Sequence, residues 1–460
     1  MKIKNQFLGL FLVLIAFSYV CIYFFPIPLL ETAVSIFIVI FIILALPALV
    51  GSLKIITYTL LVLAITMLVA VKAPIGEWID GVRVNLTLVS IFTFVPLLGI
   101  PVRLGGYLES LKLLFERLNP KPTYVFLITQ TLTHLLAVVL NIGSISIVHY
   151  LSKAAPIQSA RLLVSAVNRG FISVIFWSPY FAAMAVVLSM LPITWGAILP
   201  YSLGIVLISF VVSILIDWSF ITKANITFAH EVSAAKEEEI PAESGGKSDK
   251  QKLSELIFLL LFMMLTILGI EFFSSLTMVV IICLVAFLFP LLWSLLYKKQ
   301  REYGAELKDH IYITLPRMKK EVVLFFVSGF FSAAFVATNI SATIINSLNE
   351  FFGGFTIGIA YCIVLVIITT SIVGMHPIVP VTIFAASFNP SLLGFSPEYF
   401  AILLLVSWGI SNSFSPATAS NNLIANLWGV DITKVTWRWN MKYGMILAIL
   451  LPIYLEIVNI

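Results

Sequence analysis

The sequence predicts an all-α polytopic membrane protein, with two inverted repeats, about 11 transmembrane helices, two re-entrant helical hairpins and broken helices. Composition is the first reason, because hydrophobic residues make up 60% of the 460 residues and charged residues only 11%. The mean hydropathy of +1.08 is typical of chains that lie in a bilayer. The other two reasons are a series of long apolar runs and a similarity between the two halves of the chain.

Segments in the two halves resemble each other at a nearly constant spacing. The Ser-Pro pair at Ser178 recurs 237 residues later at Ser415, and the segment around Ser90 recurs 238 residues later at Ser328. Ser165 with Ser407 and Gly143 with Gly374 give two further pairs. Chance similarity between apolar segments is the alternative, but four pairs in the same order favour an internal duplication. Duplicated apolar chains with broken segments are typical of secondary transporters, which bind solute between the copies.

Eleven apolar runs are long enough to cross a bilayer. They lie at residues 7–25, 31–50, 53–71, 84–100, 162–190, 196–216, 253–272, 275–297, 321–345, 397–430 and 443–459. Two further runs, 124–152 and 356–390, are interrupted near their middles, and we interpret each as a re-entrant hairpin. The first run has no small-residue cleavage site before Pro26, so we interpret it as a retained span.

The basic residues indicate the orientation of the chain. Lys2, Lys4 and most other basic residues fall on one side of this arrangement, and no Lys or Arg occurs between Glu321 and Thr433. The positive-inside rule therefore predicts a cytoplasmic N-terminus and hairpins that enter from opposite sides. Only Lys72 and Arg83 disagree with this rule. Five spans and one hairpin in each half would invert the second copy relative to the first.

These features predict four segments. Residues 1–30 form an extra first span, 31–220 the first repeat, 221–252 a cytoplasmic linker and 253–460 the second repeat. The linker contains KEEEIPAESGGKSDKQK, whose charge and Pro/Gly content predict disorder. A regulatory site in this linker is the alternative. We expect an integral, multi-pass protein of a prokaryotic cytoplasmic (inner) membrane.

A polar break interrupts the apolar run at 397–430. The stretch SNSFSPATASNN at 411–422 is rich in hydroxyls and amides, and its proline removes a helical hydrogen bond. Such groups can coordinate an ion or bind a carboxylate, whereas close packing through small residues is the alternative. The density of asparagine favours a binding site. Its candidate residues are Asn412, Ser413, Ser415, Pro416, Thr418, Asn421 and Asn422.

The corresponding part of the first repeat runs from Val167 to Pro179. Its candidates are Arg169, Ser178 and Pro179. An arginine inside the membrane boundary is costly unless it is paired or reaches water. Arg169 could bind a substrate carboxylate through two parallel hydrogen bonds. Alternatively, it could extend to the cytoplasmic face as a snorkelling side chain.

The two hairpin tips provide the remaining candidates. These are Asn141, Gly143 and Ser144 in the first tip, and His376 and Pro377 in the second. Glycine and proline suit the sharp turn of a re-entrant segment. His376 could carry a proton or donate to the substrate, or it could simply satisfy a backbone carbonyl.

Several functional classes are disfavoured by what the sequence lacks. No carboxylate lies clearly at the centre of a span, which counts against a sodium/proton antiporter. Short outer loops with almost no basic residues count against an intramembrane enzyme such as a glycan ligase. The three cysteines are far apart, so neither a disulfide framework nor a metal site is expected. The net charge of +5 comes from loops and indicates topology rather than a nucleic-acid partner.

The segment from Ser413 to Leu450 resembles the last broken helix of the divalent anion/sodium symporter family, within the ion-transporter superfamily. Comparable places are held by Pro416, Thr418, Asn422, Ile424, Gly429 and Lys434. The order of spans and hairpins is similar over nearly the whole chain. That family carries Ser-Asn-Thr at its hairpin tips, whereas the tips here read Asn-Ile-Gly-Ser and Gly-Met-His-Pro. The chain therefore resembles a divergent member.

The resemblance implies an elevator mechanism, in which a domain of hairpins and broken helices slides against a scaffold that forms a homodimer. Together these observations predict a secondary active transporter, not an enzyme, for a small organic anion such as a carboxylate. Sodium and protons are both candidates for the coupling ion, and no cofactor is expected other than a bound sodium ion. A cation/proton or inorganic-anion exchanger of the same fold is the alternative, and an intramembrane enzyme is a more distant one.

Overall fold

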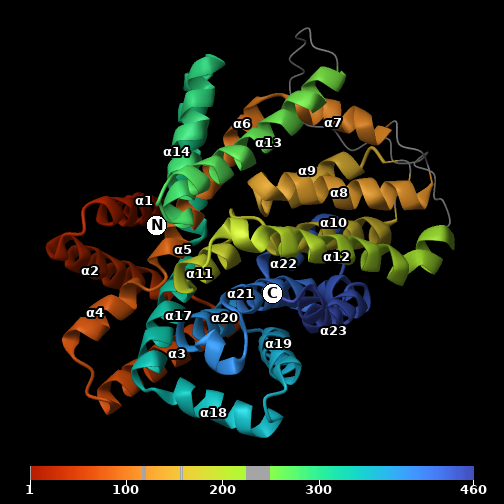
Figure 1. The fold of residues 1–460 in the computed structure, drawn as a ribbon. Helices are drawn as coiled ribbons and strands as arrows, with labels where there is room; N and C mark the ends of the chain where they lie inside the picture. Colours follow the sequence, from red (N-terminus) through yellow and green to blue (C-terminus); the bar gives the residue numbers. More distant parts are fainter. Residues whose placement is uncertain (1, 117–120, 156, 158, 224–248) are drawn as a thin grey trace.

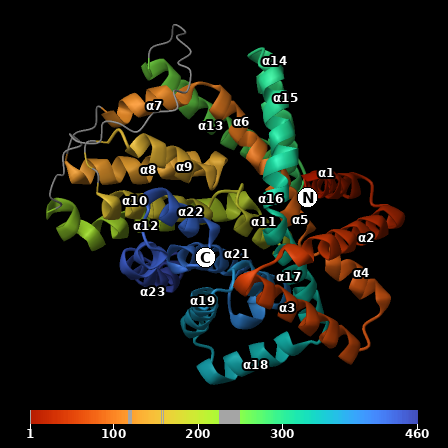
Figure 2. The ribbon, with the colours of Figure 1, turned by 180° about the vertical axis from the view of Figure 1, so that it is seen from behind.

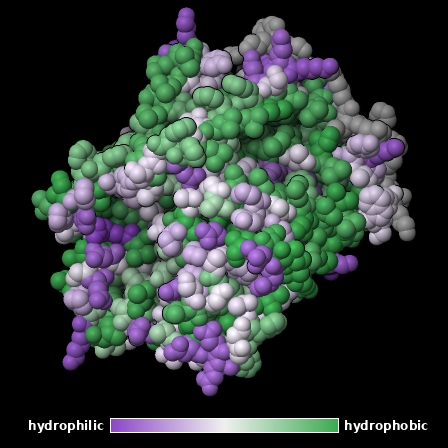
Figure 3. All heavy atoms as spheres, in the orientation of Figure 1, coloured by the Kyte–Doolittle hydropathy of each residue, from purple (hydrophilic) through white to green (hydrophobic). Residues whose placement is uncertain are grey.

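The computed structural model describes residues 2–116, 121–155, 157, 159–223 and 249–460, and its regular elements in these ranges are all helices. Eleven helical stretches in this part of the chain are long and apolar enough to cross a bilayer. Apolar residues cover large areas of the face seen in Figure 3. The structure therefore confirms an all-α polytopic membrane protein (Figure 1).

Two blocks of the chain form what we call the frame helices. The first block contains α1 (Lys2–Phe24), α2 (Pro28–Ala45), η1 (Leu46–Ala48), α3 (Gly51–Ala70), α4 (Ile75–Arg83), α5 (Leu86–Phe94), η2 (Val95–Leu98), α6 (Gly99–Leu104) and α7 (Tyr107–Glu116). The second contains α13 (Asp249–Phe273), α14 (Met278–Leu296), α15 (Gln300–Asp309), η3 (His310–Thr314), α16 (Leu315–Arg317), α17 (Lys319–Ala337) and α18 (Ile340–Phe352).

The blocks that follow each of these form what we call the hairpin helices. The first contains α8 (Pro122–Leu140), α9 (Gly143–Ser152), α10 (Ala160–Ile175), α11 (Ala182–Met190) and α12 (Trp195–Lys223). The second contains α19 (Thr356–Ile372), α20 (Ile378–Ser387), η4 (Pro390–Leu393), α21 (Pro397–Phe414), α22 (Ala419–Trp428), η5 (Lys434–Arg438) and α23 (Met441–Val458). Frame and hairpin helices thus alternate twice along the sequence.

The number of spanning stretches agrees with the prediction, but their identity differs. The first arm of the first hairpin, Pro122–Leu140, is by itself long enough to cross a bilayer. The run at 162–190 is not one long helix, because it is divided into α10 and α11 around Ser178-Pro179. Of the predicted linker at 221–252, α12 takes the start and α13 the end, while residues 224–248 lie outside the described residues.

Both interrupted runs fold as helical hairpins. The first turns at Asn141, where φ is +49°, and the second turns at Gly374, where φ is +101°. Left-handed backbone of this kind suits asparagine and glycine, which tolerate a positive φ better than most residues. Their sequence therefore fixes where each helix reverses, as seen for α8 and α9 in Figure 2.

Corresponding contacts occur in the two hairpin blocks. The first arms α8 and α19 pack on the broken helices of their own blocks, α10 and α21. The second arms cross over, so that α9 packs on α22 and α20 packs on α11. Helices α10 and α21 also contact each other directly. The hairpin helices of both blocks therefore form one packed group.

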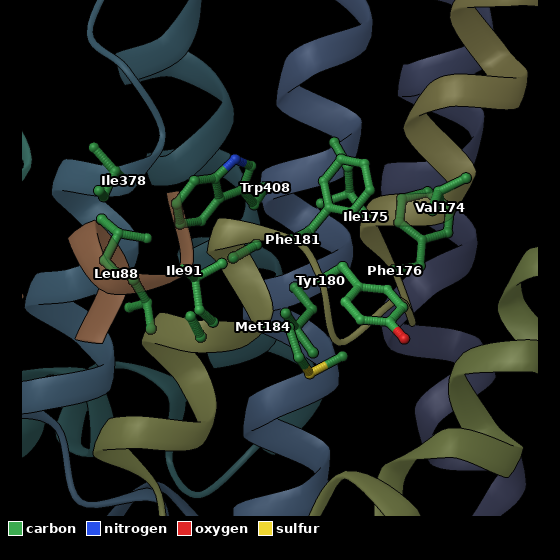
Figure 4. Packing of buried hydrophobic residues seen from close by; sticks show 14 of the residues in the cluster. Leu88, Ile91, Val174, Ile175, Phe176, Tyr180, Phe181, Met184, Ile378 and Trp408 are labelled. Atoms are coloured by element: carbon green, nitrogen blue, oxygen red, sulfur yellow. The ribbon is translucent and has the colours of Figure 1, made fainter. Parts of the chain in front are cut away.

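Apolar side chains fill much of the boundary between this group and the frame. Helix α5 packs on α11, and α17 packs on α20. Figure 4 shows Leu88 and Ile91 of α5 close to Phe181, Ile378 and Trp408 of the hairpin helices. All five side chains are buried. Burial of apolar surface rather than hydrogen bonding therefore holds this part of the boundary.

Candidate functional site

The break between α21 and α22 follows from its local sequence. Ser415 is extended, with φ −79° and ψ 122°, and Pro416 cannot donate a helical hydrogen bond. Thr418 then begins the next helix, because its side-chain oxygen accepts from the backbone N–H of Asn421 at 3.4 Å. The chain is therefore unwound over 415–418, inside an otherwise helical stretch.

The side chain of Asn421 stabilises this break through three hydrogen bonds. Its Nδ2 donates to the carbonyls of Asn412 at 2.7 Å and Ser415 at 2.9 Å. Its Oδ1 accepts from Nδ2 of Asn168, in α10, at 2.7 Å. All four residues are buried. One amide thus closes the unwound turn and ties it to the broken helix of the other block.

The second hairpin also reaches the break. The hydroxyl of Ser415 donates to the carbonyl of Ser371, in the last turn of α19, at 2.8 Å. The ring of His376, in the hairpin turn, lies 5.8 Å from the ring of Trp408. Asn412 donates to the carbonyl of that same tryptophan at 3.1 Å. Parts of α10, α19, α21 and α22 therefore converge here.

One acceptor at this site has no partner within the described residues. Oδ1 of Asn168 is buried and accepts no hydrogen bond from any described group. Buried polar atoms in proteins are normally paired. An oxygen of this kind suits a cation or a hydrogen-bond donor of a ligand. The start of α22 adds the positive end of a helix dipole beside the break.

Another face of the break is open. Ala417, Ala419 and Asn422 are exposed, and Pro416 is partly so. The amide of Asn422 donates to the carbonyls of Pro416 and Thr418, both at 2.9 Å. The predicted residues Ser415, Thr418 and Asn421 thus lie on the buried side, and Asn422 lies on the accessible side.

Ser413 contacts a different element. Its hydroxyl donates to the carbonyl of Ile410 at 2.7 Å. A Cβ added at Gly444 would lie 2.4 Å from this hydroxyl, so Ser413 packs tightly against α23. We therefore assign Ser413 to helix packing and not to the polar side of the break.

Arg169 is fully buried and engaged within the protein, which neither expectation for it anticipated. Its guanidinium pairs with Asp217 of α12 at 2.5 Å. It also donates to Oδ1 of Asn440 at 3.0 Å and to the carbonyls of Ser213 at 2.8 Å and Trp439 at 2.9 Å. In this structure Arg169 therefore joins α10 to α12 and to the turn before α23, and it neither snorkels nor faces the break.

Ser178 and Pro179 lie in an apolar environment. Both are buried, and Oγ of Ser178 accepts from the backbone N–H of Tyr180 at 3.4 Å. The surrounding break carries Phe176, Tyr180 and Phe181 (Figure 4). The first break therefore has the predicted Ser-Pro interruption but not the amides of the second.

The two hairpin tips are held by local hydrogen bonds. Ser144 donates from its hydroxyl to the carbonyl of Asn141 at 2.7 Å, while Gly143 beside it is exposed. In the second tip, Nδ1 of His376 accepts from the backbone N–H of Ile378 at 3.2 Å, and Pro377 is buried. His376 thus contacts the backbone at the start of α20 through this nitrogen.

Three residues that the candidate set omitted contribute to the convergence, namely Asn168, Ser371 and Trp408. An asparagine within an apolar helix was a usable signal for Asn168, because its amide must find partners. Ser371 acts through its backbone carbonyl, and Trp408 through its carbonyl and ring. Such roles carry no distinctive sequence signal.

Comparisons with known proteins bear on the fold. No protein-family model matches the chain, and no curated protein matches it. The chain is similar to the crystal structure of the YdaH transporter of Alcanivorax borkumensis, which is described as having an unusual topology. The TM-score is 0.55 and the identity 15%, over 92% of this chain and 98% of that one. The likeness shows a membrane-transporter fold, and it does not extend to the divalent anion/sodium symporter family in particular.

Proposed function

We propose that this protein is a secondary active transporter for a small organic anion such as a carboxylate, coupled to sodium or protons. The observation that carries the proposal is the break at 415–418, where Asn421 joins two broken helices and Ser415 reaches a hairpin. Irregular backbone at membrane depth requires such internal partners, and it offers polar groups to a solute. The likeness to a solved transporter supports this class.

The division into frame and hairpin helices supports an elevator mechanism. Within the hairpin group, buried polar contacts such as Arg169 with Asp217 and Asn168 with Asn421 join separate helices. At the boundary, apolar side chains of α5, α11 and α20 meet, and hydrogen bonds such as Ser332 with Thr382 are fewer. Apolar contacts are non-directional, so they can be exchanged without leaving buried polar groups unpaired. We infer that the hairpin helices move together against the frame.

The groups at the break suggest sodium as the first coupling ion to test. Hard cations prefer oxygen ligands, and the break offers amide and hydroxyl oxygens together with the unpartnered Oδ1 of Asn168. Asp217 is a less suitable proton carrier, because it pairs with both Arg161 and Arg169. Exchange of inorganic ions is a second candidate, which the engagement of Arg169 away from the break favours.

We also propose that the protein acts as a homodimer in a prokaryotic cytoplasmic membrane, with its N-terminus in the cytoplasm. The distribution of basic residues supports this orientation. The homodimer rests on the family resemblance, in which the scaffold provides the interface.

A melting-temperature screen of the purified protein with carboxylates and inorganic anions, with and without sodium, tests the proposal. Ligands that bind only the folded state raise the melting temperature. We expect one class of carboxylate to do so in the presence of sodium. A shift with sodium or inorganic anions alone would favour the exchanger.

Two variants locate the site in the same screen. Asn421→Ala should abolish the carboxylate shift and lower the free energy of unfolding by about 1–3 kcal/mol, because it leaves Asn168 unpaired. Asn426→Ala changes an exposed asparagine of the same helix and should leave the shift intact. An unchanged ligand shift in folded Asn421→Ala would remove the break as the site.

A further inference from the structure

An apolar groove opens on the frame, away from the site described above. It has a volume of about 520 Å³ and lies between α2, α3, α4 and α17. Residues that line it include Ile36, Val39 and Ile43 of α2, Ile65 of α3, Trp78 of α4 and Phe330 of α17. Ile36 and Ile43 are 53% and 61% exposed, so the groove is open from the side of two spanning helices.

The two hydroxyls that line this groove, those of Thr32 and Ser35, already form hydrogen bonds within the protein. Thr32 donates to the carbonyl of Pro28 at 3.0 Å. Ser35 lies 3.2 Å from the carbonyl of Glu31 and 3.0 Å from that of Ile79. A polar occupant would therefore gain little from the groove, whereas a hydrocarbon chain would bury apolar surface.

One end of the groove carries charge. Arg83 pairs with Glu31 at 2.8 Å and with Asp80 at 2.5 Å. Lining residues Thr32, Ile79 and Val82 are direct sequence neighbours of this triad. The side chain of Asp80 is 71% exposed, so it can meet a further partner. An apolar groove with charges of both signs at one end matches a molecule that has a hydrocarbon chain and a zwitterionic head.

We propose that the groove binds one chain of a zwitterionic phospholipid with an ammonium headgroup, with the ammonium at Asp80 and the phosphate at Arg83. The triad holds two carboxylates and one guanidinium, which disfavours a purely anionic headgroup.

Bound lipid would support the helix against which a hairpin packs. Phe330 lines the groove, and Ser332 on the same helix α17 donates to the carbonyl of Thr382 of α20 at 3.3 Å. The lipid thus fills the frame behind the boundary with the second hairpin. The site is independent of the proposed transport site, so each can fail without the other.

Native mass spectrometry of the full chain tests the proposal, with phosphatidylethanolamine, phosphatidylcholine and phosphatidylglycerol of identical acyl chains as probes. We expect the unmodified protein to retain phosphatidylethanolamine preferentially. Val39→Trp fills the groove and should weaken retention about tenfold or more. Val62→Trp, at an exposed α3 position that does not line the groove, should retain lipid normally. Asp80→Asn should reduce the preference for the ammonium headgroup.

Several results would overturn the proposal. Equal retention by Val39→Trp and Val62→Trp would mean that lipid binds elsewhere, and a preference for phosphatidylglycerol would contradict the headgroup assignment. Loss of a dimer in Val39→Trp without loss of lipid would show that a second copy fills the groove. If Val39→Trp does not fold, acyl-brominated phosphatidylethanolamine provides the test, because it should quench the unmodified protein more than Trp78→Phe. Equal quenching of the two proteins would exclude the groove.

Discussion

Two neighbouring residues of α10 have different partners. Asn168 reaches Asn421 across the break, whereas Arg169 reaches Asp217 and Asn440. Adjacent positions on a helix point in different directions, so a pair of polar residues can serve a binding site and a structural contact at once. We therefore separate the two, with Asn168 at the candidate site and Arg169 as a connection between helices.

Arg169→Lys tests this assignment. A lysine can still pair with Asp217, but it cannot reproduce the planar set of donors that Arg169 presents. Removing one partner of a buried ion pair lowers the free energy of unfolding by about 3–5 kcal/mol. Because lysine replaces the arginine only in part, we expect Arg169→Lys to lose a substantial part of that amount in urea unfolding. Arg161→Lys, at a side chain that is 40% exposed, is the matched control and should cost about 1 kcal/mol or less. Wild-type stability of Arg169→Lys with loss of ligand binding would instead make Arg169 a substrate ligand.

At the scale of elements, the backbone groups left unpaired at helix ends are bound by side chains from other parts of the chain. At the break over 415–418, the side chain of Asn421 donates to two backbone carbonyls. At the start of α12, a glutamate from another helix accepts from two backbone N–H groups. Glu271 of α13 accepts from the backbone N–H of Trp195 at 2.8 Å and of Gly196 at 3.1 Å. A carboxylate is favourable at a helix N-terminus because the unpaired N–H groups there carry partial positive charge. This contact joins the frame to the hairpin helices.

Glu271→Ala should therefore weaken the attachment of α12 to the frame. We expect a loss of up to about 2 kcal/mol, the range for a partly buried charge at a helix end, measured as a lower melting temperature. Glu271→Gln keeps an acceptor without the charge, so its melting temperature should lie between those of the unmodified protein and Glu271→Ala. Glu350→Ala, at an exposed position of α18, is the control. Equal melting temperatures for Glu271→Ala and the control would show that the contact contributes nothing.

At the scale of the whole molecule, the alternation of frame and hairpin blocks is the defining feature. Residues 122–223 and 356–458 pack together, although a frame block separates them in the sequence. Their boundary with the frame is largely apolar where α5 meets α11 (Figure 4). Such a boundary suits relative movement of two bodies, which is what an elevator requires.

Cross-linking across the boundary tests this movement. In a protein whose three cysteines are replaced by alanine, Ser332→Cys with Thr382→Cys joins α17 to α20. A short bifunctional thiol reagent should stop uptake into proteoliposomes while ligand-induced stabilisation persists. Tyr201→Cys with Tyr454→Cys joins α12 to α23 within the hairpin group and should leave uptake unchanged. Full uptake after complete cross-linking of the first pair would contradict the elevator.

The sequence by itself determined the membrane class, the paired hairpins and the break at Pro416. These follow from local physics: apolar run length, the positive φ at Asn141 and Gly374, and the missing N–H of a proline. Which polar groups meet was decided by tertiary structure alone. Asn168 and Asn421 are 253 positions apart, and Arg169 and Asp217 are 48 apart. A buried polar group must find a partner, but its own segment does not specify which helix supplies that partner.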